Sequence, residues 1–254
     1  MINGNYHTHT RRCKHAYGTD EDYVLAAIEA GYDELAFTDH APWNLIEDET
    51  DRIRMHMREM KEYVTSIRAL KEKYKNKINI LVGLEAEFFE SRLSELKALV
   101  EEYDLDLIVL GNHFHIKDSN ETYYGNYKDY RNLYHDYLSD SIKAMRSGVY
   151  KIFAHPDLFL KTANVINSAT IEMIHALCDV AIETNTIMEY NLGGKRYRDH
   201  YPNETFWKIV AERGCKIIVG VDAHDPKHLK DTKMMQEART FLMRLNANLI
   251  TSLD

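Results

Sequence analysis

Short apolar runs alternate with longer amphipathic stretches along the 254 residues of this chain. Seven runs have the length and composition of strands: the segment ending at His7, 34–38, 78–84, 105–110, 150–154, 187–191 and 216–221. A helix is predicted through 23–28, closed by Gly31, and a long amphipathic helix from about Arg52 to Lys75. In the long helix, apolar residues recur at spacings of three and four: Met60, Tyr63, Val64, Ile67, Leu70 and Tyr74. This alternation is typical of β-α units around a parallel sheet.

Each predicted strand ends in polar residues, and this regularity decides between architectures. In parallel α/β barrels the carboxyl ends of the strands converge on one face, which carries the chemistry. Eight strands are usual for a chain of about 250 residues, but the pattern supports seven. We therefore predict an α/β fold in which residues 1–254 form a single domain, a distorted seven-stranded (β/α)7 TIM-like barrel. The competing open, doubly wound sheet would gather ligands mainly at one switch point instead of at nearly every strand.

The polar residues at these strand ends are largely histidine, aspartate and glutamate. Neutral imidazole and carboxylate are the usual ligands of zinc, iron and manganese, and a set of this size predicts more than one ion. His7 and His9 alternate in a strand-like segment, so that both side chains can point to one side. The sequence therefore predicts a multinuclear metallohydrolase.

Composition narrows the class of protein. With 44% hydrophobic and 28% charged residues, the chain can bury the core of one soluble domain. No apolar run is long enough to span a bilayer and the first residues lack the features of a signal peptide, so we expect a cytoplasmic protein with no membrane partner. Forty acidic against 32 basic residues, a net charge of -8, argue against a nucleic-acid partner. Cys13, Cys178 and Cys215 lack metal-finger or redox spacing and are expected to be ordinary buried residues.

Seven stretches, taken together and in this order, resemble the polymerase and histidinol phosphatase (PHP) superfamily, and most of all its stand-alone histidinol-phosphate phosphatases. They are His7-Thr-His9, Cys13-Lys-His15-Ala16, Phe37-Thr-Asp-His40-Ala-Pro42, Gly83-Leu-Glu85-Ala-Glu87, Leu110-Gly-Asn-His113-Phe114, Ala154-His155-Pro-Asp157-Leu158 and Gly220-Val-Asp222-Ala-His224. The resemblance covers almost the whole length of the chain.

The resemblance implies a site for three divalent metal ions. The first ion takes His7, His9, Glu85 and Asp222 as ligands. Glu85 also bridges to a second ion, which is bound by His113 and His155. The third ion takes His15, His40 and His224, although His40 could instead orient another ligand. Zinc, iron and manganese suit these ligands equally, so the identity of the metals is left open.

The implied activity is hydrolysis of a small phosphorylated metabolite, with L-histidinol phosphate of histidine biosynthesis as the leading substrate. A metal-bridging hydroxide would be the in-line nucleophile and no phosphoenzyme would form, with Glu85, Asp222 and His224 as catalytic residues. The proton donor for the leaving alkoxide is left unassigned. Lys161, Arg196 and Arg198 are candidates for binding the phosphate, and Lys161 stands where the family more often has arginine.

Several alternatives stay open from the sequence. The substrate could be another phosphomonoester, such as a nucleotide or a sugar phosphate, or the domain could be a metal-binding module without catalysis. Oligomeric state is not predicted. Asp39 and Asp157, each next to a proposed ligand, could orient an imidazole or cap a turn, and His115 is expected to support the site without being a ligand.

A tyrosine-rich stretch also allows two interpretations. Tyr123, Tyr124, Tyr127, Tyr130, Tyr134 and Tyr137 follow one another closely. We expect a tyrosine-rich helix packed on the barrel rather than a substrate mouth, although tyrosine rings could stack on an imidazole.

Overall fold

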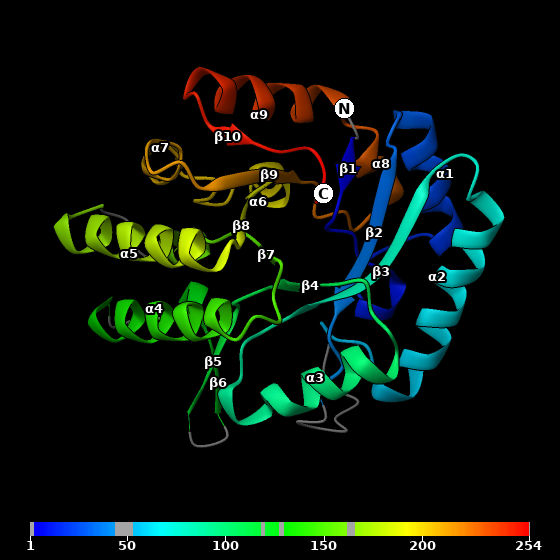
Figure 1. Ribbon diagram of the computed structural model, residues 1–254, viewed down its shortest axis with the longest axis horizontal. Coiled ribbons are helices and arrows are strands. Elements are labelled where there is room, and N and C mark those ends of the chain that lie inside the picture. The colour runs from blue at the N-terminus through cyan, green and yellow to red at the C-terminus, as the bar shows by residue number, and fades with distance from the viewer. Residues whose placement is uncertain (1–2, 44–52, 118–119, 127–129, 162–165, 254) are drawn as a thin grey trace.

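The computed structural model describes residues 3–43, 53–117, 120–126, 130–161 and 166–253. Its centre is a curled parallel sheet with helices on all sides (Figure 1). The strands pair in the order β1-β2-β3-β4-β7-β8-β9-β10. Their bounds are β1 Gly4–Asn5, β2 Glu34–His40, β3 Asn79–Ala86, β4 Leu107–Leu110, β7 Ile152–Phe153, β8 Ile187–Asn191, β9 Lys216–Gly220 and β10 Asn248–Leu249. Each of the seven predicted strands overlaps or adjoins one of these.

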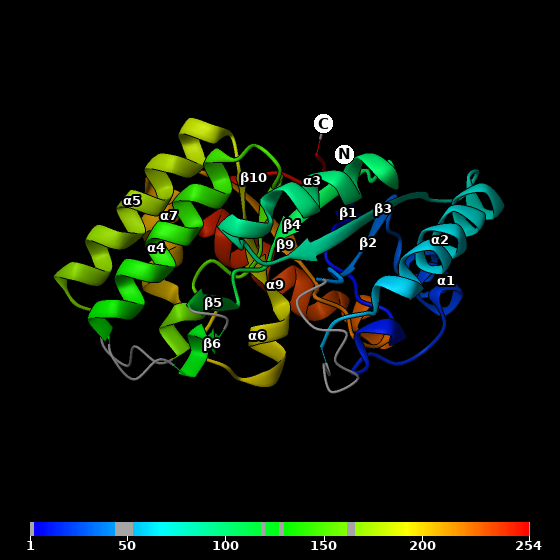
Figure 2. The same ribbon diagram turned by 90° about the horizontal axis from the view of Figure 1, so that it is seen from below.

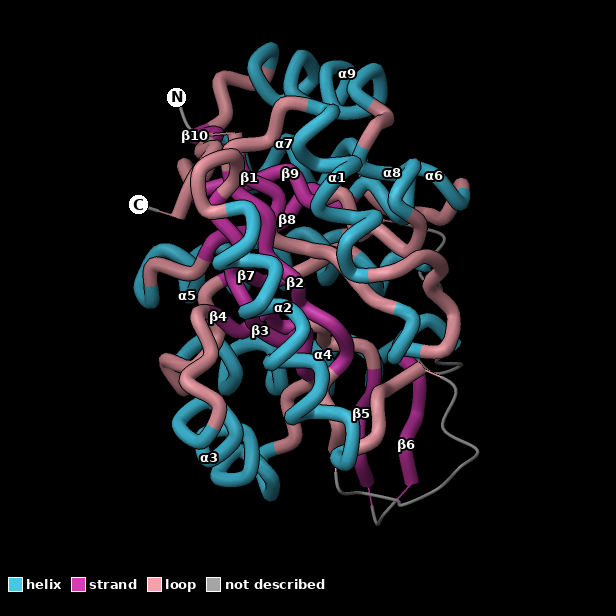
Figure 3. The backbone as a smooth tube through the Cα atoms, turned by 90° about the vertical axis from the view of Figure 1, so that its right-hand side faces the viewer, coloured by secondary structure: helices cyan, strands magenta, loops and turns pink. Residues whose placement is uncertain are grey.

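The sheet curls until its first strand meets its last ones (Figure 3). The Gly4 amide donates to the carbonyl of Thr251 at 2.9 Å, just beyond β10. At the other end of β1, the His9 amide donates to the carbonyl of Ala223 at 2.9 Å. The predicted α/β barrel class is confirmed, and the short eighth strand β10 is an addition to the seven expected. The sequence also did not predict the antiparallel hairpin β5 (Phe114–Lys117) and β6 (Asn120–Tyr123).

Helices cover the outside of the sheet (Figures 1 and 2). They are α1 Asp20–Ala30, α2 Met60–Tyr74, α3 Leu93–Glu102, α4 Tyr130–Arg146, α5 Ser168–Thr184, α6 Leu192–Tyr197, α7 Glu204–Glu212, α8 Pro226–Leu229 and α9 Thr232–Arg244. Single 3-10 turns are η1 Arg11–Cys13, η2 Met57–Glu59, η3 Glu90–Arg92, η4 Tyr124–Asn126 and η5 Leu158–Lys161. Among the described residues, no helix combines the length and the apolar composition needed to cross a membrane.

Helix α1 ends as the sequence predicted. Thr19 and Asp22 form a capping box at its amino end, in which the side chain of each accepts from the backbone amide of the other. Gly31 follows the helix in the left-handed conformation, with φ of 79°, which glycine adopts without strain.

Helix α2 is shorter than predicted at its amino end. Residues 53–56 are not helical, and Arg52 lies outside the described residues. The amide of His56 donates to the side chain of Glu59 at 2.7 Å, which fixes the start of the 3-10 turn η2 at Met57. The apolar face was predicted correctly, because every one of its members from Met60 to Leu70 is buried.

Alternate residues of the strands enter two different cores. In β4, Ile108 and Leu110 pack with the residues of the surrounding helices. Leu107 and Val109 join a second, smaller cluster with residues of β2, β7, β8 and β9. This period of two is expected for a sheet covered on both faces, and it defines an inner face of the barrel and an outer face beneath the helices.

Candidate metal centre

The nine predicted metal ligands come together at the carboxyl ends of the strands. They extend from strand ends and the loops that follow: His7 and His9 after β1, His15 after η1, His40 in β2, Glu85 in β3, His113 after β4, His155 after β7, and Asp222 and His224 after β9. Eight of them line a cavity of about 250 Å³, and the ninth, His7, is fully buried beside His9. The structure therefore gathers residues more than 200 positions apart into one site.

The strand period explains why these side chains face inward. Ala36 belongs to the inner cluster of the barrel, and His40 lies four residues later on the same strand, β2. Leu81 of β3 packs against the same cluster, and Glu85 again lies four residues later. Because successive side chains of a strand alternate between faces, residues four apart share a face. The inner apolar positions thus continue into ligands where the barrel opens.

Glu85 lies between two pairs of histidines. Its Oε2 is 3.5 Å from Nε2 of both His7 and His9. Its Oε1 is 3.1 Å from Nε2 of His155 and 3.4 Å from Nε2 of His113. Within each pair, the Nε2 atoms are 3.1 Å and 3.2 Å apart. The two oxygens of one carboxylate therefore address two separate groups of nitrogens, which is the arrangement of a bridging ligand.

The remaining ligands surround Asp222 and His224, except that His40 Nδ1 also lies 3.1 Å from Glu85 Oε2. Asp222 Oδ1 is 3.3 Å from His9 Nε2 and 3.3 Å from His224 Nδ1. The rings of His15 and His224 have centroids 4.6 Å apart, whereas those of His15 and His40 are 5.7 Å apart. Ligand atoms of His9, His40 and His224 lie within 4.8 Å of one another. His224 is thus the member that connects His15 to the rest.

The buried polar atoms of the site fit divalent cations. Within the described part of the chain, seven of them form no hydrogen bond: Glu85 Oε2, Asp222 Oδ1, His224 Nε2 and the Nδ1 atoms of His9, His40, His113 and His155. A buried carboxylate oxygen or imidazole nitrogen without a partner is costly unless another group satisfies it. Nitrogen and oxygen donors of these kinds are the ligands of zinc, iron and manganese. The site therefore has the composition, convergence and unsatisfied atoms of a metal centre.

The electrostatics favour ionised carboxylates and a neutral His40. At His7 and His9, burial is outweighed by nearby carboxylates, which raise the pKa well above its ordinary value, so a cation that binds there displaces a proton. Burial by itself raises the pKa of Glu85, but His113, His7 and His40 outweigh it and hold that pKa well below its usual range. The pKa of Asp222 is likewise well below its usual range, because nearby imidazoles outweigh its burial. Burial lowers the pKa of His40 well below its ordinary value. Ionised carboxylates and a neutral imidazole can coordinate a cation without first losing a proton.

Glu189 belongs to the site and was missed by the sequence analysis. It lies in β8, is fully buried, and both of its carboxylate oxygens are 3.0 Å from His7 Nδ1. A carboxylate of this kind accepts the Nδ1 proton and leaves Nε2 of His7 free to face the cavity. One oxygen of Glu189 also accepts from the Asn191 side chain at 2.7 Å. Glu189 and Asn191 lie two residues apart in an otherwise apolar strand, and this alternation was the signal that could have revealed Glu189.

Asp39 and Asp157, for which the sequence left two roles open, differ in what they contact. Asp39 Oδ1 is 3.4 Å from His9 Nδ1, and its other oxygen accepts from the amide of Thr10, so it contacts an imidazole and caps a turn. Asp157 accepts from the Asn203 amide and from the Trp207 indole, at 2.7 and 2.9 Å. It therefore anchors the segment that enters α7.

The structure changes two further expectations, for His115 and for Cys13. His115 does not support the site: its Nδ1 is 2.9 Å from Asp140, and it lines a separate cavity. Strand β5 directs it there, away from the nine residues of the cluster. Cys13, expected to be an ordinary buried residue, is fully buried but has its sulfur within 4.8 Å of ligand atoms of His15 and His224.

The three predicted phosphate-binding residues have different surroundings. Lys161 Nζ lies 3.3 Å from Asp199 and 5.8 Å from the ring centroid of Tyr123, a residue that lines the cavity. Arg196 Nη1 donates to the carbonyl of Val221 at 3.2 Å. Its Nη2 is buried and has no hydrogen-bond partner in the described ranges. Arg198 follows α6 and is exposed. The three basic residues lie outside the lining of the cavity itself, and Lys161 and Arg196 are the two whose contacts reach residues beside it.

The tyrosine-rich stretch contains tyrosines that pack on the barrel and one tyrosine that lines the cavity, the two roles that the sequence suggested. Tyr124 and Tyr137 are fully buried and pack edge to face, with ring centroids 4.9 Å apart. Tyr123 instead lines the metal cavity, together with Tyr197 and Tyr201 from elsewhere in the chain. Tyr127 lies outside the described residues, as does the side chain of Tyr130. Packing on the barrel was therefore the right prediction for part of the stretch.

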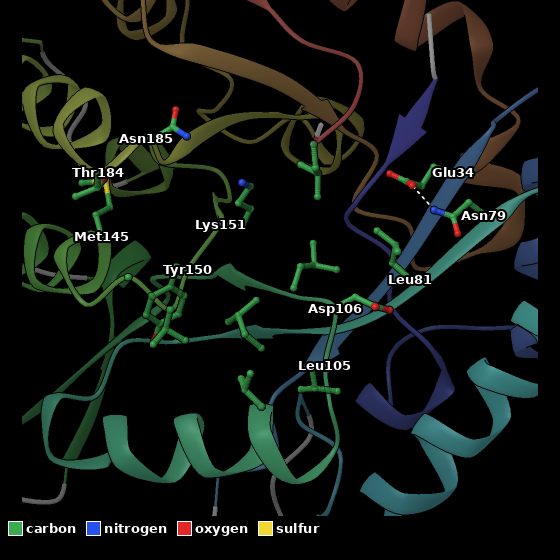
Figure 4. Close-up of a pocket in the computed structure, with 16 residues that line it drawn as sticks. Glu34, Asn79, Leu81, Leu105, Asp106, Met145, Tyr150, Lys151, Thr184 and Asn185 are labelled. Atoms are coloured by element: carbon green, nitrogen blue, oxygen red, sulfur yellow. Dashed lines mark hydrogen bonds between the residues drawn. The ribbon is translucent and has the colours of Figure 1, made fainter.

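A larger cavity, of about 660 Å³, lies among residues that precede or begin the strands (Figure 4). No predicted site residue lines it. Three of its polar side chains form hydrogen bonds within the protein: Asn79 donates to Glu34, and Asp106 accepts from the amide of Val82 at 2.8 Å. Size alone therefore does not identify the site, and the chemistry lies in the smaller cavity with the unsatisfied ligands.

Comparisons with known proteins agree with this geometry. A protein of Deinococcus radiodurans named "Probable histidinol-phosphatase" is 30% identical over 234 residues, covering 87% of this chain and 85% of that protein. The "Histidinol-phosphatase" of Bacillus subtilis is 25% identical and covers 86% of this chain and 92% of its own. The fold matches a crystal structure of Lactococcus lactis histidinol phosphate phosphatase complexed with zinc, L-histidinol and phosphate. That match has a TM-score of 0.75 and 19% identity, and it covers 98% of this chain and 95% of that one.

Residues 5–192 match the PHP domain family. This range runs from the end of β1 to the end of β8 and contains seven of the nine gathered ligands, Glu85 among them. The predicted resemblance is confirmed, and so is the prediction of a metal-dependent phosphatase. The chain belongs to the PHP domain family.

Proposed function

We propose that this chain hydrolyses L-histidinol phosphate at a centre of three divalent metal ions. The observation that carries the proposal is Glu85, whose two oxygens face two separate groups of histidine nitrogens, those of His7, His9 and His40 at Oε2 and those of His113 and His155 at Oε1. Curated relatives that are aligned over most of both chains bear the name histidinol-phosphatase. This supports the choice of L-histidinol phosphate among the phosphate esters that such a site could accept.

Three ligand sets follow from the geometry and the resemblance. In this proposal His7, His9, Glu85 and Asp222 hold the first ion, Glu85, His113 and His155 the second, and His15, His40 and His224 the third. Bound cations supply Lewis acidity, which activates water and neutralises the phosphoryl oxygens. Zinc, iron and manganese remain equal candidates on donor chemistry.

The chain's own residues orient this centre. Glu189 accepts the Nδ1 proton of His7, and Asp39 lies on the corresponding side of His9. Both imidazoles therefore present Nε2 toward Glu85 and Asp222. Asp222 also accepts from the Asn191 amide at 3.3 Å, which fixes its carboxylate plane. Preorganisation of this kind lowers the cost of assembling the reacting geometry.

The proposal assigns phosphate binding to two basic residues near the cavity. Arg196 has one guanidinium nitrogen free of hydrogen-bond partners within the described residues, and its other contact is the backbone next to Asp222. Lys161 lies at the rim, against the ring of the cavity residue Tyr123. We propose these two, and not the exposed Arg198, as the phosphate-binding residues.

Phosphate release tests the proposal. Metal-loaded protein is assayed with L-histidinol phosphate against a panel of nucleotide, sugar and amino-acid phosphates, with Asp222→Ala as the inactive control. A large preference in kcat/KM for L-histidinol phosphate, abolished in the control, is the expected result. Efficient turnover of a different ester would replace the substrate, and absence of turnover with every ester would contradict the proposal in favour of a non-catalytic metal-binding module.

A further inference from the structure

Asp199 has no role in the proposed phosphate chemistry, yet in the chain it lies between two residues that line the metal cavity, Tyr197 and Tyr201. Both of its carboxylate oxygens are 3.3 Å from Lys161 Nζ. Asp199 is two residues before Tyr201, and Lys161 is three residues after Leu158, and both Tyr201 and Leu158 line the cavity. The ion pair is thus carried by two segments that form the wall of the site.

A hydrogen bond fixes the backbone at Asp199 independently of the lysine. The Asp199 amide donates to the carbonyl of Gly194 at 2.9 Å, and Gly194 follows Gly193, another residue of the cavity wall. The lysine contacts a different part of the wall, the ring of Tyr123. Both charged side chains are partly exposed, Lys161 by 32% and Asp199 by 27%, so solvent screening makes the pair weak and exchangeable.

Phosphate binding changes the charge balance at this ion pair. In the proposed function, Lys161 turns toward the phosphate of the substrate. Asp199 then loses its partner and lies near a second anion, and this repulsion disfavours binding unless the substrate brings a cation of its own. A substrate with a phosphate and an ammonium group would satisfy both residues at once.

We infer that Asp199 binds an ammonium group on the alcohol part of the substrate, so that the site selects phosphate monoesters of amino alcohols. The resting pair between Lys161 and Asp199 is exchanged for two new pairs, lysine with phosphate and aspartate with ammonium. This inference rests on the proposed function for its phosphate site, and L-histidinol phosphate, which carries a primary amine, belongs to the selected class. It assigns to Asp199 a contribution to specificity.

The test measures an amine preference, the ratio of kcat/KM for an ester with the amine to that for its matched ester without it. Two matched pairs are used with the metal-loaded full chain: L-histidinol phosphate with 3-(imidazol-4-yl)propyl phosphate, and phosphoethanolamine with ethyl phosphate. Asp199→Asn removes the charge and keeps the shape. Glu237→Gln is the control, because Glu237 forms a comparable ion pair with Lys195 at 2.9 Å on an exposed surface.

We expect the wild-type protein and Glu237→Gln to prefer the amine-bearing ester. In Asp199→Asn the preference should fall by about 10- to 100-fold, the range for a hydrogen bond to a charged group, with a much smaller change for the amine-free ester. An equal loss on both members of a pair would overturn the inference, since Asp199 would then only position Lys161. So would a wild-type protein without amine preference in either pair.

The outcomes separate this inference from the proposed function. If L-histidinol phosphate is a poor substrate but phosphoethanolamine is preferred over ethyl phosphate through Asp199, the proposed substrate fails and the inference holds. If L-histidinol phosphate is hydrolysed well and Asp199→Asn leaves the amine preference intact, the proposed function holds and the inference fails. Absence of turnover with all four esters would overturn both.

Discussion

Replacing Glu189 by glutamine should weaken metal binding although Glu189 is not itself a proposed ligand. The carboxylate is fully buried, and His7 Nδ1 lies 3.0 Å from each of its oxygens. A glutamine amide keeps the volume but removes the charge, and it must place its NH₂ group toward either His7 or the donating amide of Asn191. The orientation and basicity of His7 would both suffer.

The expected loss is about 10- to 100-fold in metal affinity, the range found when an outer partner of a histidine ligand is removed. This corresponds to roughly 1.4–2.7 kcal/mol at 1.36 kcal/mol for each factor of ten. Competition with a chromophoric chelator gives the dissociation constants, and elemental analysis gives the metal content of purified protein. Glu237→Gln, on the exposed surface, is the matched control.

A second substitution, at Gly220, should displace the Glu189 carboxylate without removing its charge. Gly220 follows Val219 in β9, and a Cβ atom at this position would collide with the carboxylate of Glu189. Because the backbone of Gly220 is not in the left-handed region, alanine brings a steric effect and little backbone strain. Gly220→Ala should therefore lower metal affinity as Glu189→Gln does. Wild-type metal affinity in both variants, with wild-type thermal midpoints, would refute the role assigned to Glu189.

Three further predictions follow from the same contacts. Removing metal with a chelator should abolish phosphate release, and adding back divalent ions one kind at a time should restore it and identify the preferred metal, as measured by the same phosphate assay. Arg54→Met should lower the free energy of unfolding by about 3–5 kcal/mol in a denaturant titration, because Arg54 pairs with the fully buried Glu87 at 2.9 Å and its loss removes the guanidinium charge, leaving the neutral Trp43 indole as a close donor at 2.7 Å; a change below 1 kcal/mol would contradict this. Gly111→Ala should reduce the bound metal measured by elemental analysis, because a Cβ there would collide with Glu85 Oε1 and with the ring of His113, and full metal occupancy would show that the bridge tolerates displacement.

The barrel and its ligands were predictable because the signals are local. A strand is a short apolar run, and the residue at which the run ends is visible without knowledge of any neighbour. In β2 the run ends at His40 and in β3 it reaches Glu85, and parallel strands place such ends on one face. Fold class and the membership of the cluster therefore required only the order of these runs.

What was missed depends on contacts between distant segments. Glu189 lies inside β8 and not at its end, so a search for polar residues at strand ends does not find it. The alternation of Ile187, Glu189 and Asn191 nevertheless indicates that the Glu189 side chain lies on the inner face of the barrel. Asp199 stands out because its carboxylate contacts Lys161, which lies 38 residues earlier in the chain. The two residues become neighbours only in the folded protein. Pairings of this kind depend on tertiary structure, which periodicity does not encode.

The way the barrel closes links the metal centre to the folding of the whole chain. His7 and His9 follow β1, which has only two residues. The backbone at both histidines is hydrogen-bonded to the segment after β9. The amide of His9 donates to Ala223, and the amide of Ala223 donates to His7, at 2.9 and 3.3 Å. Asp222 precedes Ala223, so the same two hydrogen bonds that close the barrel set the distance from Asp222 to both histidines. Ligands from the two ends of the chain meet only after closure, and cations bound between them stabilise the closed barrel over every open form.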